Sequence, residues 1–226
     1  MLKFYFHPAP NPMKVALFLE ESGLPYEVVP VDMRKGDQFK PEFLAINPNA
    51  KTPAILDGDI RVFDSNAILL YLAEKTSQFL PEAGLRNRGE LLSWLMFIAS
   101  GIGPYSGQAV HFGHYAPKGL DYAVKRYDFE ARRHWEILDG QAQAGPFLLG
   151  DKYTIADMAA WGWARAVPYV LGNKAWETLP HLKRWFDLVN ARPAAQRAEA
   201  LKDKFAFKAE MDEEARKHLF RHISAK

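Results

Sequence analysis

The sequence predicts a small α/β domain followed by an all-α domain. Strand and helix patterns alternate through residues 1–80, whereas only helical patterns occur beyond residue 90. Between them lies the polar stretch Ser77 to Arg88, which contains Pro81 and Gly84. We therefore expect an α/β domain over residues 1–80, a linker over 81–88, and a helical domain with a C-terminal tail over 89–226.

The elements expected in the first domain give the order βαβαββα. They are a strand over Leu2–Phe6, a helix with the stripe Val15, Ala16, Phe18 and Leu19 that ends at Gly23, a strand over Glu27–Val31, a helical turn over Pro41–Ile46, strands over Pro53–Leu56 and Ile60–Phe63 around Asp57-Gly58-Asp59, and a helix that ends near Thr76. The first part suits a parallel βαβ unit, and the hairpin supplies antiparallel strands. A strand, a Pro-rich turn and a helix at the start are typical of a thioredoxin-like unit.

The second domain shows only amphipathic helical patterns. They run over Glu90–Ala109, Tyr122–Ala144, Ile155–Val170 and His181–Asn190, with a further tail helix within Glu199–Lys226. Gly101, Gly103 and Pro104 should interrupt the first helix. Thr154 is expected as an N-cap, with Asp157 reaching back in a variant of the capping box.

Composition excludes several classes of function. A net charge of +2 gives no reason to expect nucleic-acid or membrane partners, and no run is long and apolar enough to cross a membrane. No signal peptide is visible, so a cytoplasmic protein is expected. Cysteine is absent, which excludes disulfides, thiolate metal sites and cysteine nucleophiles. The pairs His218/His222 and His111/His114 lack a third ligand, so no metal is expected.

The turn after the first strand carries the main question about chemistry. In a redox protein of this shape the turn would hold a reactive cysteine, but here it reads His7-Pro-Ala-Pro-Asn11. Asn11 before Pro12 predicts a helix N-terminus with Asn11 as N-cap. Helix N-termini lower thiol pKa values, and that thiol can belong to a ligand. From the residues alone, Asn11 either caps its own helix or also contacts such a thiolate.

Three stretches resemble the cytosolic glutathione transferase superfamily. They are "PEFLAINPNAKTPAILD", "VFDSNAILLYLAEK" and "FLLGDKYTIADMAAW", and the resemblance extends over residues 1–195. Four others resemble the bacterial nu class, namely "PAPNPMKVALFLEE", "KGDQFKPEFL", "GPYSGQAVHFGHYAP" and "AVKRYDFE". The resemblance implies the glutathione transferase fold, glutathione as cosubstrate without a metal, reduction of small disulfides, and a homodimer.

The resemblance assigns the catalytic role to Asn11, which would contact the glutathione sulfur. Ala9 departs from the class, where a Thr often supplies a second sulfur contact. Arg126 matches an Arg that reaches the glutathione of the neighbouring subunit. As an isolated residue on a helix surface, Arg126 would simply be solvated.

The same resemblance assigns the rest of the glutathione site. Gln38 would contact the glycyl end, and Thr52, before a cis Pro53, would pair its backbone with the cysteinyl part. Ser65 would hold the γ-glutamyl carboxylate at a helix N-terminus, and Asp64 its ammonium. Without the resemblance, Gln38 reads as a loop residue, Pro53 as an ordinary trans proline and Asp64-Ser65 as a plain N-cap.

A second-substrate pocket is expected beside the Gly/Pro break. Seven aromatic side chains are candidates for it, namely Trp94, Phe97, Tyr105, Phe112, Tyr115, Trp161 and Trp163. Because most aromatics at helical spacing belong to the core, only Tyr105 and Phe112 are singled out. The leading hypothesis is a glutathione-dependent disulfide-bond oxidoreductase that acts on small disulfides. The alternatives are conjugation of glutathione to an electrophile, and a non-catalytic glutathione-binding regulator.

Overall fold

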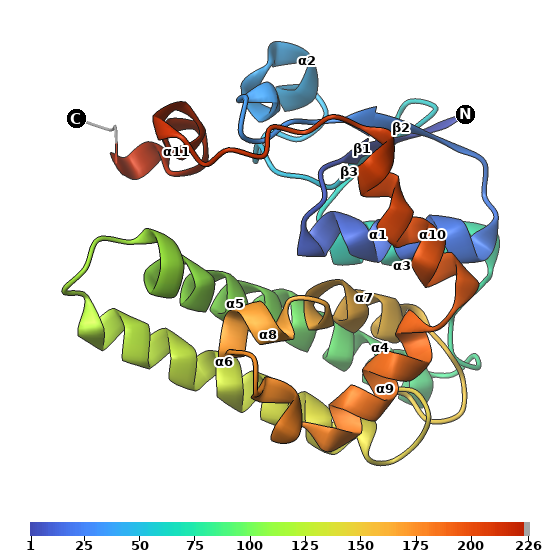
Figure 1. Ribbon diagram of the computed structural model, residues 1–226. Coiled ribbons are helices and arrows are strands. Elements are labelled where there is room, and N and C mark those ends of the chain that lie inside the picture. The colour runs from blue at the N-terminus through green and yellow to red at the C-terminus, as the bar shows by residue number, and fades with distance from the viewer. Residues whose placement is uncertain (224–226) are drawn as a thin grey trace.

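The computed structural model describes residues 1–223 and shows a sheet domain stacked on a helical domain (Figure 1). In chain order the first domain contains β1 (Leu2–Phe6), α1 (Pro10–Ser22), β2 (Tyr26–Pro30), α2 (Pro41–Leu44), β3 (Ala54–Asp57), β4 (Ile60–Phe63) and α3 (Ser65–Thr76). This is the predicted order βαβαββα. Helices α1 and α3 lie between the sheet and the helical domain, whereas α2 lies on the far side of the sheet.

The four strands form a mixed sheet in the order β2-β1-β3-β4. Strand β1 pairs with β2 in parallel and with β3 antiparallel, so that Phe4 lies opposite both Val28 and Ile55. Alternate side chains of β1 point to opposite faces of the sheet. Leu2, Phe4 and Phe6 are accordingly buried in the core. The predicted parallel βαβ unit and closing antiparallel hairpin are both confirmed.

The second domain is helical, as predicted. Its helices are α4 (Leu85–Phe97), α5 (Gly103–Val110), α6 (Asp121–Ala142), α7 (Ile155–Ala164), α8 (Val167–Leu171), α9 (Pro180–Asn190), α10 (Pro193–Ala200) and α11 (Glu213–Leu219). A π-helical turn over Ile98–Ile102 marks the predicted interruption at Gly101 and Gly103. The expected helix over Ile155–Val170 is divided into α7 and α8, and α10 was not predicted.

One hydrophobic core spans both domains. Phe4 and Leu17 of the first domain and Trp135 and Trp161 of the second belong to one cluster of buried residues. Helix α1 packs against α7, and Gly162 permits this approach, because a Cβ there would meet Pro10 O at 2.4 Å. The packing therefore brings the first turns of α1 directly against α7.

The start of α7 has the predicted capping box. The Thr154 hydroxyl accepts from the Ala156 N–H, and the Asp157 carboxylate accepts from the Thr154 N–H at 2.9 Å. Asp157 also accepts from the Leu148 N–H at 2.9 Å and from Trp185 Nε1 at 2.8 Å. Burial raises the pKa of Asp157, and these hydrogen bonds favour its ionised form.

The start of α1 differs from the prediction. The helix begins at Pro10 with Ala9 as N-cap, and Asn11 lies in the first turn without capping it. Both prolines fit there because first-turn N–H groups have no partner within the helix. Since proline has no N–H and the Met13 N–H donates to Ala9 O, only Asn11 keeps a free helical N–H in this turn. The expected N-cap at Asn11 was therefore wrong.

The C-terminal tail crosses back over the sheet domain instead of forming one helix. From Figure 1 it runs past β2 and β1 towards α2. The Arg34 guanidinium donates to Lys208 O and Ala209 O at 2.8 and 2.6 Å, and the Lys208 N–H donates to Asp32 Oδ2 at 2.8 Å. Within the expected range Glu199–Lys226, helix α11 covers only Glu213–Leu219, and residues 224–226 lie outside the described part.

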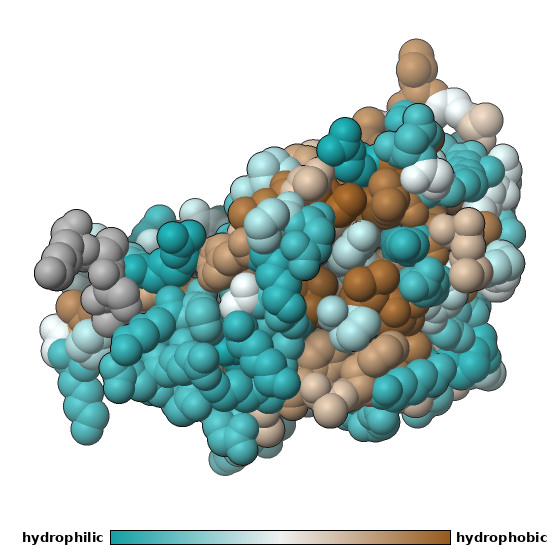
Figure 2. Space-filling model, turned by 90° about the horizontal axis from the view of Figure 1, so that it is seen from above, coloured by the Kyte–Doolittle hydropathy of each residue, from teal (hydrophilic) through white to brown (hydrophobic). Residues whose placement is uncertain are grey.

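The face seen from above the sheet is mostly hydrophilic, with hydrophobic residues gathered near its middle (Figure 2). Among residues 1–223, no helix is long and apolar enough to cross a membrane.

Candidate active site between the two domains

Three adjoining pockets lie along the sheet domain, two of them at its junction with the helical domain. The first, of about 350 Å³, lies between Asn11, Lys14 and Ser65 on one side and Gly103, Pro104 and Trp163 on the other. The second, of about 210 Å³, extends from Asn11 and Ser65 to Thr52 and Pro53. The third, of about 520 Å³, lies beside the turn at residues 7–10. Lys51 lines all three, so we treat them as one cleft.

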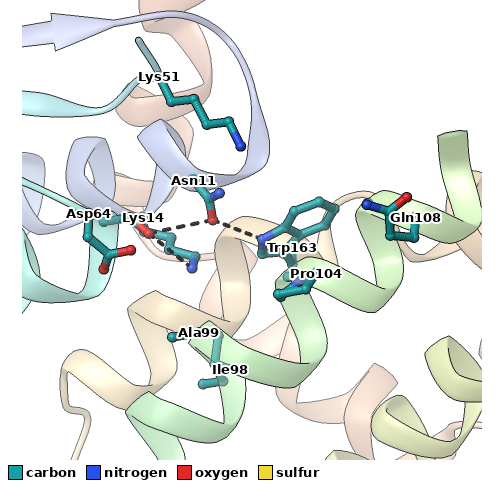
Figure 3. Close-up of a pocket in the computed structure, with 12 residues that line it drawn as sticks. Asn11, Lys14, Lys51, Asp64, Ile98, Ala99, Pro104, Gln108 and Trp163 are labelled. Carbon is teal, nitrogen blue, oxygen red and sulfur yellow. Dashed lines mark hydrogen bonds between the residues drawn. The ribbon is translucent and has the colours of Figure 1, made fainter. Parts of the chain in front are cut away.

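Asn11 lies at the meeting point of the first two pockets. Its amide oxygen accepts a hydrogen bond from Trp163 Nε1 at 2.9 Å and a longer one from Ser65 Oγ at 3.5 Å. In Figure 3 both dashed lines end on this oxygen, and the amide nitrogen carries none. Within residues 1–223 the nitrogen has no acceptor, yet it is not a buried unsatisfied atom. Its two N–H groups are therefore available to a ligand in the cleft.

Lys14 is a buried cation beneath this site. Its side chain is 1% exposed, and its Nζ donates to Ser65 Oγ at 3.2 Å and to Asn66 Oδ1 at 3.1 Å. Burial lowers the pKa of Lys14 to about 7, and the nearby Asp64 carboxylate opposes that shift. The group therefore places a positive charge, or a readily protonated amine, directly under Asn11 and Ser65.

The N-terminus of α3 forms the wall opposite α5. Asp64 caps the helix, because its carboxylate accepts from the Asn66 and Ala67 N–H groups at 2.9 and 3.2 Å. Its φ of 70° is unusual for a residue with a side chain. Ser65 is the first helical residue, so its N–H has no partner within the helix and suits a carboxylate.

The Thr52–Pro53 peptide bond is cis, as predicted. Both residues line the second pocket, together with Asn11, Asp64 and Ser65. The structure thus brings together five of the seven residues proposed for glutathione binding.

The other proposed residues lie elsewhere. Gln38 is 1% exposed and donates to Met33 O at 3.1 Å, and it lines none of the three pockets. Arg126 pairs with Glu130 on α6 at 2.6 Å, with half of its side chain exposed. Tyr105 packs near His134, and Phe112 stacks on Tyr127 at 5.1 Å. Neither aromatic lines these pockets, so their roles stay predictions.

The third pocket has a wall that the sequence did not indicate. Met211, Leu219 and Phe220 of the tail line it together with the turn at residues 7–10, Tyr115 and Tyr169. Phe220 packs on Tyr115 with ring centroids 5.4 Å apart. This pocket is the most apolar part of the cleft.

Sequence reasoning also missed Lys14 as a site residue and passed over Trp163 in favour of Tyr105 and Phe112. Lys14 carried a signal, since it stands within the apolar run Met13–Leu19. Nothing in the sequence distinguished Trp163 from Trp161. Among residues 1–223, no three His, Asp or Glu side chains are grouped to hold a metal.

Comparison with known proteins identifies the family. The model of the glutathione S-transferase N-terminal domain matches residues 1–74, and that of the C-terminal domain matches residues 117–193. The chain belongs to the glutathione S-transferase family. This confirms the predicted membership and fold.

Several relatives of the family are similar over most of their length. Disulfide-bond oxidoreductase YfcG of Escherichia coli is 42% identical over 205 residues, which are 88% of this chain and 94% of that protein. A family member from Pseudomonas fluorescens, crystallised with two glutathione molecules, has a TM-score of 0.83 and 39% identity, with 88% and 92% of the two chains covered. A glutathione transferase from Pseudomonas putida with glutathione disulfide bound has a TM-score of 0.82 and 33% identity, covering 88% and 90%.

Proposed function

We propose that the protein is a glutathione-dependent disulfide-bond oxidoreductase. The observation that carries the proposal is the free amide nitrogen of Asn11, which faces the cleft of a chain without cysteine. The sulfur must then come from the ligand, and the relatives support glutathione as that ligand.

The chemistry is a thiol–disulfide exchange between ligands. A glutathione thiolate, held by the Asn11 N–H groups, attacks one sulfur of a disulfide RSSR and releases RS⁻, which takes up a proton as RSH. A second glutathione thiolate attacks the mixed disulfide and releases the other RS⁻, which also takes up a proton, leaving glutathione disulfide. Two glutathione molecules are oxidised for each disulfide reduced. The protein lowers the pKa of the attacking thiol and holds the reactants together.

Binding of glutathione is proposed for the second pocket and its surroundings. Thr52, next to Pro53, pairs with the cysteinyl part, the Ser65 N–H holds the γ-glutamyl carboxylate, and Asp64 holds the ammonium. Gln38 remains proposed for the glycyl end. We also propose nu-class membership, a cytoplasmic location, a homodimer, and a linker at residues 81–88, within which α4 begins at Leu85.

Titration calorimetry with glutathione and glutathione disulfide, followed by a steady-state assay on a model disulfide, tests the proposal. Saturable binding and turnover that requires glutathione are expected. Absence of binding at millimolar glutathione would contradict it.

Conjugation to an electrophile is a second candidate, favoured by the apolar third pocket beside the turn. An assay with a model aryl halide tests it, and we expect lower activity than on the disulfide. Binding without either activity would instead support a non-catalytic regulator.

A further inference from the structure

We propose that a chain of hydrogen bonds running between the two domains fixes the orientation of the Asn11 amide, with Trp163 and Lys14 as its positioning residues. The chain, here called the orientation relay, consists of Trp163, Asn11, Ser65, Lys14 and Asn66. The inference rests on the proposed function, because it concerns how Asn11 presents donors to the sulfur.

Trp163 determines which end of the amide faces the cleft. An indole N–H can only donate, so the Asn11 atom 2.9 Å from Trp163 Nε1 must be the oxygen. The amide nitrogen, which donates two hydrogen bonds, is thereby directed away from the indole (Figure 3). In the reversed orientation, the N–H groups of the Asn11 amide would face the Trp163 N–H, and the amide oxygen would face the thiolate.

Lys14 determines the direction of the second hydrogen bond. When Lys14 is protonated, its ammonium group has three donors and no acceptor, so Ser65 Oγ then accepts from it at 3.2 Å. The hydroxyl hydrogen of Ser65 is then free to point to Asn11 Oδ1, at 3.5 Å. The amide oxygen therefore has two donors, one for each of its lone pairs.

The relay is anchored in the helical domain at both ends. Trp163 belongs to α7, and Asn66 Nδ2 donates to the Leu95 carbonyl of α4 at 2.7 Å. Asn66 Oδ1 in turn accepts from Lys14 at 3.1 Å. Asn11 and Lys14 on α1, and Ser65 and Asn66 on α3, lie between these anchors. A shift between the domains would disturb the orientation of Asn11 without breaking the glutathione contacts at Thr52.

Trp163→Phe tests the relay, because it removes the N–H and keeps an aromatic ring. Trp161→Phe is the matched control, since Trp161 lies on the same helix but donates to Asn190 at 3.2 Å. The pKa of the bound glutathione thiol, followed by ultraviolet thiolate absorbance, is measured beside kcat and KM. Trp163→Phe should raise that pKa and lower kcat about tenfold, or about 1.4 kcal/mol. KM for glutathione should change little, and the control should leave the thiol pKa unchanged.

A double-mutant cycle shows whether Trp163 acts through Asn11. In the Asn11→Ala background, Trp163→Phe should have almost no further effect on kcat. The same tenfold loss in that background, or an equal effect of Trp161→Phe, would overturn the relay. Lys14→Met tests the Lys14 end of the orientation relay by the same cycle. It replaces Trp163→Phe as the test if that variant does not fold.

The outcomes separate this inference from the proposed function. If the unmodified protein binds no glutathione, the proposed function fails and the relay with it. If it binds glutathione as a thiolate whose pKa is the same in Trp163→Phe and Lys14→Met, only the relay is contradicted.

Discussion

At the scale of single residues, Lys14 shows how a site residue is visible in a sequence and yet not interpretable there. A lysine among Met13–Leu19 stands on a helix face that is otherwise apolar, and in the structure residues 12–19 are all buried. Its partners, Ser65 and Asn66, are more than fifty positions away. No local pattern could name them, because the contact depends on how α1 and α3 pack.

The lowered pKa of Lys14 predicts a pH-dependent stability. Between pH 7 and the ordinary lysine pKa near 10.5, the unfolded chain binds this proton and the folded protein does not. Stability therefore rises with pH across that window, by at most about 1.4 kcal/mol per pH unit. We expect the free energy of unfolding, measured by denaturant titration, to rise with pH more in the unmodified protein than in Lys14→Met. If the free energies of unfolding of the two proteins change in parallel with pH, the lowered pKa of Lys14 is contradicted.

Asn11 illustrates a different difficulty. The sequence indicated both the helix start and the residue, but it placed the cap two positions too late, because Pro10 and Pro12 are each compatible with the first turn. The correction matters for function. An Asn11 that does not cap its own helix has its side chain free for the cleft.

At the scale of elements, the contact between α1 and α7 positions the relay. Gly162 lies where a Cβ would meet Pro10 O at 2.4 Å and Lys14 Cγ at 2.5 Å. No sequence pattern indicates this requirement, since glycine within a helix usually only weakens the helix. The helices themselves follow from apolar periodicity, but the closeness of their approach does not.

Gly162→Ala should therefore destabilise the protein, by about 1–3 kcal/mol, because the backbone of α1 must move. It should also lower the rate of disulfide reduction by displacing Trp163 from Asn11. Gly140→Ala on α6 is the control, as its added Cβ meets nothing within 4 Å and improves helix propensity. Thermal unfolding and kcat are the measurements. Equal effects of the two substitutions would argue against the close approach.

The tail is the element that sequence patterns described least well. Its charged, weakly amphipathic residues suggested one helix, whereas Arg34, Asp32 and Phe6 hold it across the sheet domain. These contacts join residues far apart in the chain, so local periodicity does not report them. The tail then supplies the apolar wall of the third pocket.

Phe220→Ala should weaken binding of an aromatic second substrate by about 1–2 kcal/mol, from the lost apolar contact. KM for that substrate should rise, and KM for glutathione should stay the same. Phe205→Ala is the control, since Phe205 contacts Phe207 and does not line the pocket. An unchanged KM for the aromatic substrate in Phe220→Ala would show that the tail does not contribute to the substrate site.

At the scale of the whole molecule, the two-domain architecture was predictable because strand patterns occur only in residues 1–80, where they alternate with helical ones, whereas only helical patterns occur beyond residue 90. The cis Thr52–Pro53 bond and the Asp64 cap were predictable from motifs. The cleft between domains was not, because its depth depends on side chains of α5 and α7 that resemble core residues in sequence.

Assembly is also a property of the whole molecule. Phe63 on the edge strand β4 and Met96 on α4 are 43% and 52% exposed, and Arg126 is half-exposed beside Glu130. We expect sedimentation to show a dimer of the 25.7 kDa chain at micromolar concentration. Arg126→Ala should keep the dimer and raise KM for glutathione. A fully active monomer would contradict a glutathione site to which Arg126 of the neighbouring subunit contributes.

The most direct test of the account is the turnover of Asn11→Ala in glutathione-dependent reduction of a model disulfide. The two N–H groups of Asn11 face the cleft without an acceptor among residues 1–223. We predict a loss in kcat of at least about tenfold, or about 1.4 kcal/mol, with glutathione affinity nearly unchanged. Ala9→Thr, which adds a hydroxyl to the same turn, should keep or raise activity. Turnover by Asn11→Ala at the rate of the unmodified protein would contradict the claim that Asn11 activates the ligand's thiol.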